Sequence, residues 1–179
     1  MTELTLSDFT ATKTRASKYL GAEQRLRDMV GFDKVAAYVE ETKALVAMRD
    51  DGANPQVLAN NLKVVVTGNS GTGKTTLARL LHKVFYSCGI VQTDRFEELS
   101  AVRLQAAGHK LKTFFSDARG GTIFLDEAYA LRSNVVTAQL LTELESVDNR
   151  DTLVVLAGYE KEMQAFFDTN QVARDRYVC

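Results

Sequence analysis

At residues 68–75 the chain reads Gly-Asn-Ser-Gly-Thr-Gly-Lys-Thr, and this stretch decides its fold. It fits the pattern G-x-x-x-x-G-K-[ST], in which glycines let backbone N–H groups curl around phosphate groups. A mostly apolar run from Leu62 to Val66 precedes it, and a helical pattern of apolar residues follows it. We therefore expect a strand, a phosphate-binding loop and a helix in that order. A Gly-rich turn without a ligand is the alternative.

In such a loop the N-terminus of the following helix adds partial positive charge near the phosphates. Lys74 would reach the β- and γ-phosphate oxygens of ATP, and the Thr75 hydroxyl would bind Mg²⁺. The residues expected to contact the nucleotide are Asn69, Ser70, Gly71, Thr72, Gly73, Lys74, Thr75 and Thr76.

The second signal is the run Thr122 to Glu127, which is apolar and β-prone and ends in two carboxylates. A buried strand that delivers an acid at its C-terminal end is how such folds hold magnesium opposite the phosphate loop. We therefore expect Asp126 to bind Mg²⁺ through water and Glu127 to act as the general base for the attacking water. The alternative is a strand that simply ends at the surface with two acids.

Composition narrows the class of protein. The chain has 179 residues, of which 45% are hydrophobic and 25% are charged, which suits one buried core. A net charge of -1 gives no electrostatic argument for nucleic acid or an anionic membrane as the main partner. Cys88 and Cys179 make neither a disulfide framework nor zinc spacing, and no apolar stretch is long enough to span a bilayer. A cytoplasmic or other reducing compartment is expected.

Periodicity places further elements along the chain. The 1–28 segment is polar and is interpreted as a linker or extension, with weak helical character at 18–29. An amphipathic helix is expected from Asp33 to Arg49, and a loop at 50–55, which contains the only proline. Strands are expected at 62–67, 96–99, 122–126 and 152–157. Further helices are expected from the phosphate loop to about Tyr86, over 101–118 with an interruption at Gly108, from Ser133 or Asn134 through Leu144, and over 160–167.

Strands separated by helices, with the phosphate loop and both acids at strand C-terminal ends, predict a three-layer α/β fold around a parallel sheet. We expect one nucleotide-binding domain, over residues 29–179.

Three stretches then carry a resemblance: Phe124 to Leu131, Val154 to Tyr159, and Asn170 to Tyr177. With the phosphate loop, they resemble the AAA-plus ATPases, and more narrowly the branch that contains stage V sporulation protein K and the red-type Rubisco activase. The resemblance covers about Val30 to Tyr177. It implies the large subdomain of a ring, usually of six subunits, that hydrolyses ATP between neighbours in order to remodel a protein client.

The resemblance also implies roles for single residues. Val30 and Gly31 would form the adenine-side wall of the pocket, and Gly158 or Tyr159 would stand at the first sensor position. Arg174 and Arg176 match the two arginines near the end of the family's module, one of which reaches the γ-phosphate on the neighbouring subunit. A solvated arginine pair is the alternative.

Two departures from the family pattern stand out. Between Ser100 and Gly120 the chain is several residues shorter than its relatives, and it offers Ala106-Ala107-Gly108-His109 where the family has a client-gripping aromatic residue. His109 is interpreted as an exposed loop residue or a weak substitute. After Arg176-Tyr177-Val178-Cys179 the family pattern continues into a helical lid, so we expect this chain to be either a fragment of a longer protein or a short form without the lid.

Three functions are consistent with these residues. The first is a magnesium-dependent ATPase module of a remodelling ring whose client is unknown. The second is a regulatory or scaffolding module that binds nucleotide with little turnover, and Glu127 is the residue that separates these two. A small-molecule P-loop kinase is a weaker third, because the residues from 150 onward supply no arginine-rich lid.

Overall fold

The computed structural model describes residues 15, 17–29, 33–52, 54–107, 111–131 and 134–170. Their elements, in chain order, are α2 (Ala22–Arg27), α3 (Asp33–Asp50), α4 (Pro55–Asn61), β1 (Lys63–Thr67), α5 (Lys74–Ser87), β2 (Phe96–Ser100), α6 (Ala101–Ala107), α7 (Leu111–Asp117), β3 (Thr122–Asp126), η1 (Ala128–Ala130), α8 (Asn134–Glu145), η2 (Val147–Asn149), β4 (Leu153–Gly158) and α9 (Glu160–Asn170).

The four strands described form one sheet in the order β1-β4-β3-β2, and every neighbouring pair is parallel. Each parallel connection needs a crossover, and helices supply it. The register pairs Thr67 at the end of β1 with Gly158 at the end of β4, and Ser100 at the end of β2 with Asp126 at the end of β3. The C-terminal ends of all four strands therefore meet along one edge of the sheet.

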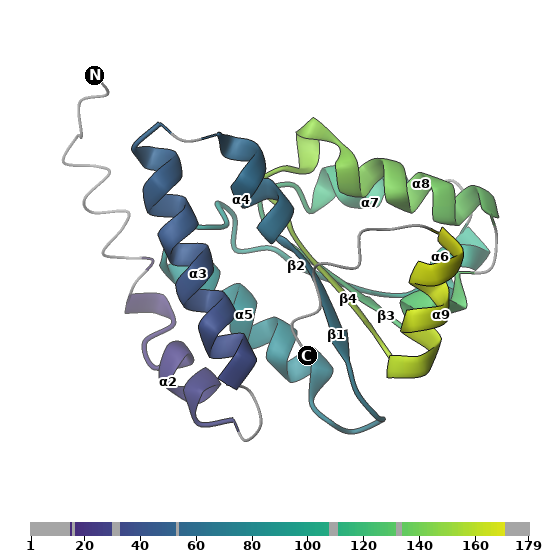
Figure 1. The fold of residues 1–179 in the computed structure, drawn as a ribbon, viewed down its shortest axis with the longest axis horizontal. Coiled ribbons are helices and arrows are strands. Elements are labelled where there is room, and N and C mark those ends of the chain that lie inside the picture. Colours follow the sequence, from purple (N-terminus) through teal and green to yellow (C-terminus); the bar gives the residue numbers. More distant parts are fainter. Residues whose placement is uncertain are drawn as a thin grey trace.

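Side chains alternate between the two faces of the sheet, so the core consists of two layers, one on each face. Val64 and Val66 of β1 and Val155 of β4 pack with α2, α3, α4 and α5. Val65 and Leu156 belong to the second layer, with α6, α7, α8 and α9. Figure 1 shows these two groups of helices on opposite sides of the sheet. The predicted three-layer α/β fold with a parallel sheet is confirmed.

Burial on both faces explains why β1, β3 and β4 read as continuous apolar runs. β4 is buried at every position, and Phe124 of β3 is 0% exposed. A Val, Leu or Phe side chain buried in this way contributes about 1.5–3 kcal/mol when it leaves water. This central position makes β3 and β4 a rigid support for the residues that follow them.

The chain differs from the sequence prediction around its proline. A loop is predicted through Pro55, but Pro55 is the first residue of α4. Proline suits this position, because the first helical N–H has no partner within the helix and the fixed φ of proline is already helical. Leu58 and Leu62 then pack in the first core layer, where they are 3% and 0% exposed.

The helix predicted over 101–118 is divided into α6 and α7, on either side of 108–110, which lie outside the described residues. The boundary predicted at residue 28 stays a prediction. Ala22 and Leu26 lie in the described part of residues 1–28 and pack in the first core layer, where they are 6% and 2% exposed.

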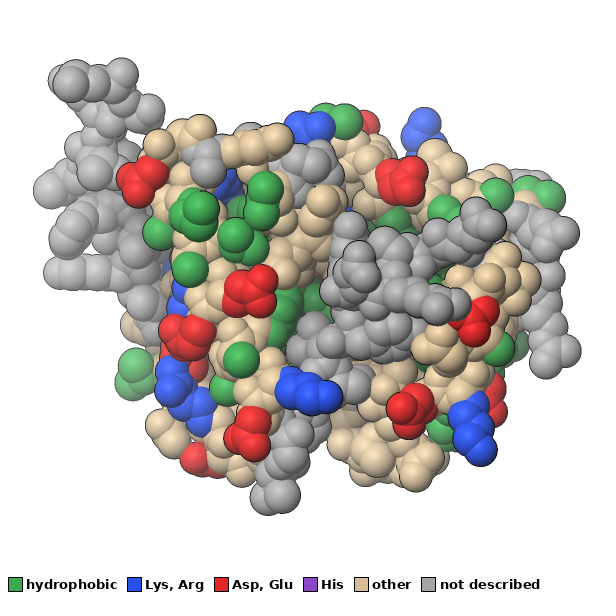
Figure 2. Space-filling view, viewed as in Figure 1, with side chains coloured by type: hydrophobic (Ala, Val, Ile, Leu, Met, Phe, Trp, Pro, Cys, Tyr) green, Lys and Arg blue, Asp and Glu red, His purple; other side chains and the backbone are tan. Residues whose placement is uncertain are grey.

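The surface carries a few large apolar side chains among charged ones. Figure 2 shows hydrophobic side chains over α3 and α4, next to acidic and basic groups. Met48 of α3 and Val57 of α4 are 56% and 52% exposed. None of the helices in the described part of the chain combines the length and apolarity needed to cross a membrane. No helical lid follows α9 within the described residues.

A polar network holds the segment before α2 against α5, the helix that begins at the phosphate loop. The Tyr19 hydroxyl donates to Asp94 Oδ1 at 2.8 Å, Lys18 pairs with the same carboxylate, and His82 Nε2 lies 3.0 Å from it. Burial opposes the charge of Asp94, but hydrogen bonds from Lys18, Tyr19 and His82 outweigh it and lower the pKa of Asp94 to about 2. This carboxylate therefore stays ionised in the folded protein at any ordinary pH.

Removing the Tyr19 hydroxyl tests the contribution of this network to stability. Tyr19→Phe should lower the free energy of unfolding by about 1 kcal/mol, because Asp94 loses a charged hydrogen bond while the ring still packs. The loss should be equal at pH 7 and pH 5, since both lie above the pKa of Asp94, about 2 in the folded state and 3.8 for the free side chain. Urea unfolding at the two pH values measures it.

The matched control is Tyr86→Phe, which removes a hydroxyl from the tyrosine that packs edge-to-face on Tyr19, with ring centroids 6.1 Å apart. It leaves the bonds of Asp94 in place and should change stability less. Equal stability of Tyr19→Phe and the parent would contradict the role given to the network.

Candidate functional site

The loop between β1 and α5 has the backbone shape that its glycines allow. Gly71 and Gly73 have φ values of 78° and 86°, in the left-handed region that glycine enters without strain. A side chain at Gly68 would put its Cβ 2.7 Å from Thr72 Oγ1. Thr72 Oγ1 in turn donates to the Asn69 carbonyl oxygen at 2.8 Å. The sequence pattern therefore corresponds to a tightly folded loop that ends at the first residue of α5.

Lys74 is the first residue of α5, and its ammonium group lies within the loop. Nζ donates to the carbonyl oxygens of Gly68 and Asn69, each at 2.8 Å. The same nitrogen lies 5.6 Å from the centroid of the Tyr159 ring, within the range of a cation–π interaction. These acceptors are neutral, so an anionic phosphate oxygen would be a stronger partner for the same ammonium.

The two carboxylates stand where β3 ends. Asp126 is its last residue, and the Glu127 backbone N–H donates to Asp126 Oδ1 at 3.0 Å. Glu127 has a φ of 53° and a ψ of 42°, and it is the one non-glycine residue with positive φ among those described. The chain then turns into η1, from which the Tyr129 hydroxyl donates to Glu127 Oε1 at 3.4 Å.

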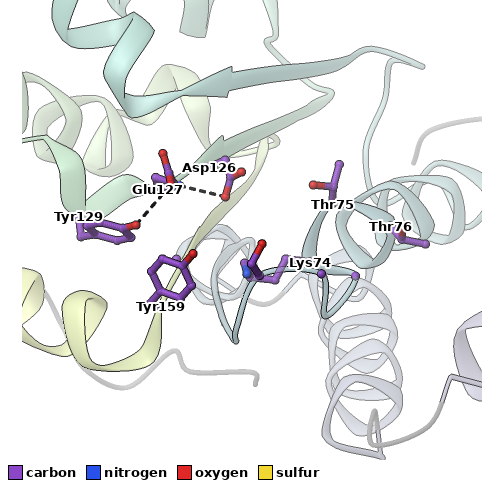
Figure 3. Close-up of a pocket in the computed structure, with 11 residues that line it drawn as sticks. Lys74, Thr75, Thr76, Asp126, Glu127, Tyr129 and Tyr159 are labelled. Atoms are coloured by element: carbon purple, nitrogen blue, oxygen red, sulfur yellow. Dashed lines mark hydrogen bonds between the residues drawn. The ribbon is translucent and has the colours of Figure 1, made fainter.

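These elements surround one cavity of about 330 Å³. Its lining residues come from the phosphate loop, from the ends of β3 and β4, and from η1: Ser70, Gly71, Gly73, Lys74, Thr75, Thr76, Asp126, Glu127, Tyr129, Gly158 and Tyr159. In Figure 3 the side chains of Asp126 and Thr75 face each other across this cavity, and Lys74 lies between Thr75 and Tyr159. A cavity of this size suits a small-molecule ligand.

The oxygen atoms of this cavity fit magnesium. A carboxylate and a hydroxyl are hard ligands, and magnesium usually binds one or two such groups together with phosphate oxygens and water. Asp126 and Thr75 therefore fit a metal that arrives with a phosphate ligand.

The predicted site residues fall into three groups. The first group lines the cavity: Ser70, Gly71, Gly73, Lys74, Thr75, Thr76, Asp126 and Glu127. Asn69 and Thr72 bond to each other and hold the loop in shape. Val30, Gly31, Arg174 and Arg176 lie outside the described residues, as does His109.

Gly158 and Tyr159, the alternatives for the first sensor position, both line the cavity at the end of β4. Sequence reasoning missed Tyr129, although it follows Glu127 by only two residues. It also missed Met29, whose Cε would lie 3.8 Å from a Cβ placed on Gly73. A tyrosine in an apolar run carries no sign of its direction, so only the fold reveals that it points to the acid.

Comparison with known proteins agrees with the geometry. The chain is 34% identical over 184 residues to the ESX-3 secretion system protein EccA3 of Mycolicibacterium smegmatis, and the match covers 94% of this chain and 30% of that protein. It is 32% identical over 174 residues to the ESX-1 secretion system protein EccA1 of Mycobacterium tuberculosis, covering 88% of this chain and 30% of that protein.

It is also 30% identical over 162 residues to the chromosomal protein CbxX of Cupriavidus necator, covering 80% of this chain and 50% of that protein. The chain thus spans between about a third and a half of the length of these relatives. Residues 64–174 match the family described as "ATPase family associated with various cellular activities (AAA)". This match includes the phosphate loop and both carboxylates, and the chain belongs to the AAA ATPase family.

Proposed function

We propose that this chain is the ATP-binding and ATP-hydrolysing module of a ring-forming, protein-remodelling AAA-plus ATPase, in the branch of stage V sporulation protein K and the red-type Rubisco activase. One observation carries the proposal. Lys74 and Thr75 from the phosphate loop and Asp126 and Glu127 from β3 line the same cavity. These are the groups that phosphoryl transfer to water requires, namely a phosphate cradle, metal ligands and a base.

In the proposed mechanism the phosphate loop and Lys74 would hold the β- and γ-phosphates, and Asp126 and Thr75 would hold magnesium. Magnesium, when bound, supplies positive charge to the phosphate oxygens. Glu127 accepts a proton from a water molecule whose oxygen attacks the γ-phosphorus, and the bond from that phosphorus to the β–γ bridging oxygen breaks. ADP and inorganic phosphate are the products.

The remaining roles complete the proposal. Val30 and Gly31 would lie against the adenine, next to Met29, which is already beside the phosphate loop. Arg174 or Arg176 would reach the γ-phosphate of a neighbouring subunit, because a guanidinium is always charged and can bind two phosphate oxygens. The ring is proposed to be a hexamer and the client a protein. Two relatives are named as secretion-system proteins, which makes a secretion-system protein a candidate client.

A regulatory or scaffolding module that binds nucleotide with little turnover is the competing function. It predicts the same cavity and the same affinity for nucleotide. The difference lies in Glu127, for which nucleotide binding alone has no chemical need. Experiments on Lys74, on Glu127 and on the arginines therefore test binding, hydrolysis and assembly separately.

The first experiment concerns binding. Lys74→Ala should weaken the affinity for MgATP about 100-fold, because phosphate charge loses its charged partner at a cost of about 3 kcal/mol. Calorimetric titration measures it. The control is Lys161→Ala, an exposed lysine on α9, which should bind as the parent does. Equal affinity of the parent and Lys74→Ala would remove the phosphate-loop assignment.

The second experiment concerns chemistry. Glu127→Gln should keep the MgATP affinity within about threefold and lower kcat by about 10² to 10⁴, since the amide keeps the shape but cannot accept the proton. Phosphate release at saturating ATP measures it. Glu145→Gln, an exposed acid at the end of α8, is the matched control and should leave kcat unchanged.

Asp126→Asn provides a contrast, because it should raise the magnesium concentration needed for turnover rather than remove the base. Should Glu127→Gln hydrolyse ATP as fast as the parent, either the base would be another residue, or both rates would be background activity and the scaffolding function would gain support.

The third experiment concerns the arginines and needs a form that assembles, such as the chain held in a ring by fusion. A double variant, Arg174→Ala with Arg176→Ala, should bind ATP normally yet hydrolyse it slowly. Mixing it with Lys74→Ala should restore part of the activity, because the arginines of Lys74→Ala subunits can serve the intact pockets of the other variant. A mixture that stays inactive, with mixed assembly demonstrated, would refute the arginine role.

A further inference from the structure

Tyr129 connects the end of β3 to the end of β4 at the wall of the cavity. It lies on η1, two residues after Glu127, and its hydroxyl donates to Glu127 Oε1 at 3.4 Å (Figure 3). Glu127 itself sits in the left-handed backbone region, which is unfavourable for a residue with a Cβ. The backbone and one long hydrogen bond thus set the direction of this carboxylate.

The ring of Tyr129 has little room to move toward β4. A Cβ at Gly158 would lie 2.7 Å from Tyr129 Cδ1 and 2.8 Å from the Met163 sulfur, so both side chains fill the space that glycine leaves. The Tyr129 ring also packs on the Tyr159 ring, with ring centroids 5.9 Å apart and ring planes inclined by 37°. These neighbours hold the ring so that its hydroxyl stays at Glu127.

The hydroxyl is a suitable donor for this purpose. Burial raises the pKa of Tyr129, and the charges of Glu127, Tyr159 and Glu162 raise it further. Tyr129 therefore keeps its proton at neutral pH and donates it to the carboxylate. A donor of this kind restrains one carboxylate oxygen and leaves the second oxygen to accept a proton from water.

We propose that Tyr129 is a positioning residue that orients Glu127 for proton abstraction, and that Gly158 is glycine because the Tyr129 ring needs its space. This rests on the proposed function, in which Glu127 is the general base. Tyr129 would then act through Glu127 rather than directly on a phosphate or a metal. Its loss should slow turnover without weakening nucleotide binding.

Tyr129→Phe tests this, because it keeps the ring and removes only the hydroxyl. We expect kcat to fall by between about tenfold and 10²-fold, because a misplacement of about 1 Å can cost 10²-fold in rate, with KM and MgATP affinity within about twofold. The control is Tyr86→Phe. Tyr86 lies on α5 and is not among the residues that line the cavity, so this variant should hydrolyse ATP as the parent does. An unchanged or raised kcat for Tyr129→Phe would overturn the positioning role.

A double variant separates positioning from a general structural effect. If Tyr129 acts through Glu127, adding Tyr129→Phe to Glu127→Gln should cause no further loss of kcat. A further tenfold loss would show that Tyr129 acts independently and would overturn the proposal. Should Glu127→Gln itself be fully active, the general-base role of Glu127 in the proposed function fails; should it be inactive while Tyr129→Phe is fully active, only the positioning role fails.

A second measurement needs no turnover. The pKa of Tyr129 can be followed by NMR of the protein with ¹³Cζ-labelled tyrosine, with the Tyr129 signal identified by its loss in Tyr129→Phe. Glu127→Gln should lower that pKa, because it removes the largest charge that raises it. Glu162→Gln, an exposed acid on α9, is the matched control and should lower it less. Equal values in the parent and Glu127→Gln would overturn the contact on which the proposal stands.

Discussion

The Gly68 N–H donates to the Gly158 carbonyl oxygen at 3.1 Å, and the rest of the site depends on this hydrogen bond. It continues the pairing of β1 with β4 by one residue beyond Thr67, into the first residue of the phosphate loop. Because β4 also pairs with β3, a single strand, β4, lies between the start of the loop and Asp126. The distance between the phosphate cradle and the carboxylates is thus set by backbone pairing within a sheet that is buried on both faces.

Gly158 has two roles in this arrangement. Its carbonyl oxygen accepts the bond from the loop, and its missing side chain leaves room for Tyr129 and Met163. An alanine there would have to displace one of these side chains or the end of β4, and each displacement would reach the cavity. A single small residue therefore couples the position of the loop to the position of the tyrosine that contacts Glu127.

Much of the fold could be predicted from the sequence, because its signals are local. The phosphate loop has a fixed spacing, and β1, β3 and β4 are apolar runs with clear boundaries, so the parallel sheet could be predicted. The order of the strands within the sheet was not predicted. The helix at Pro55 was missed because a proline indicates a loop unless the residues after it are known to pack. The contact between Tyr129 and Glu127 was missed for another reason, since it depends on the turn at Glu127, which glutamate rarely makes.

That turn also bears on the choice between a hydrolase and a binding module. A glutamate in the left-handed region costs about 1 to 2 kcal/mol relative to ordinary backbone, and a glycine at the same position would avoid the cost. The Asp126 bond to the Glu127 N–H and the Tyr129 bond to its carboxylate offset part of that cost. Nucleotide binding requires only the loop, Lys74 and the metal ligands, and gains nothing from an acid held in this way. Strained residues that their neighbours support are typical of functional sites, so the backbone at Glu127 favours hydrolysis over binding alone.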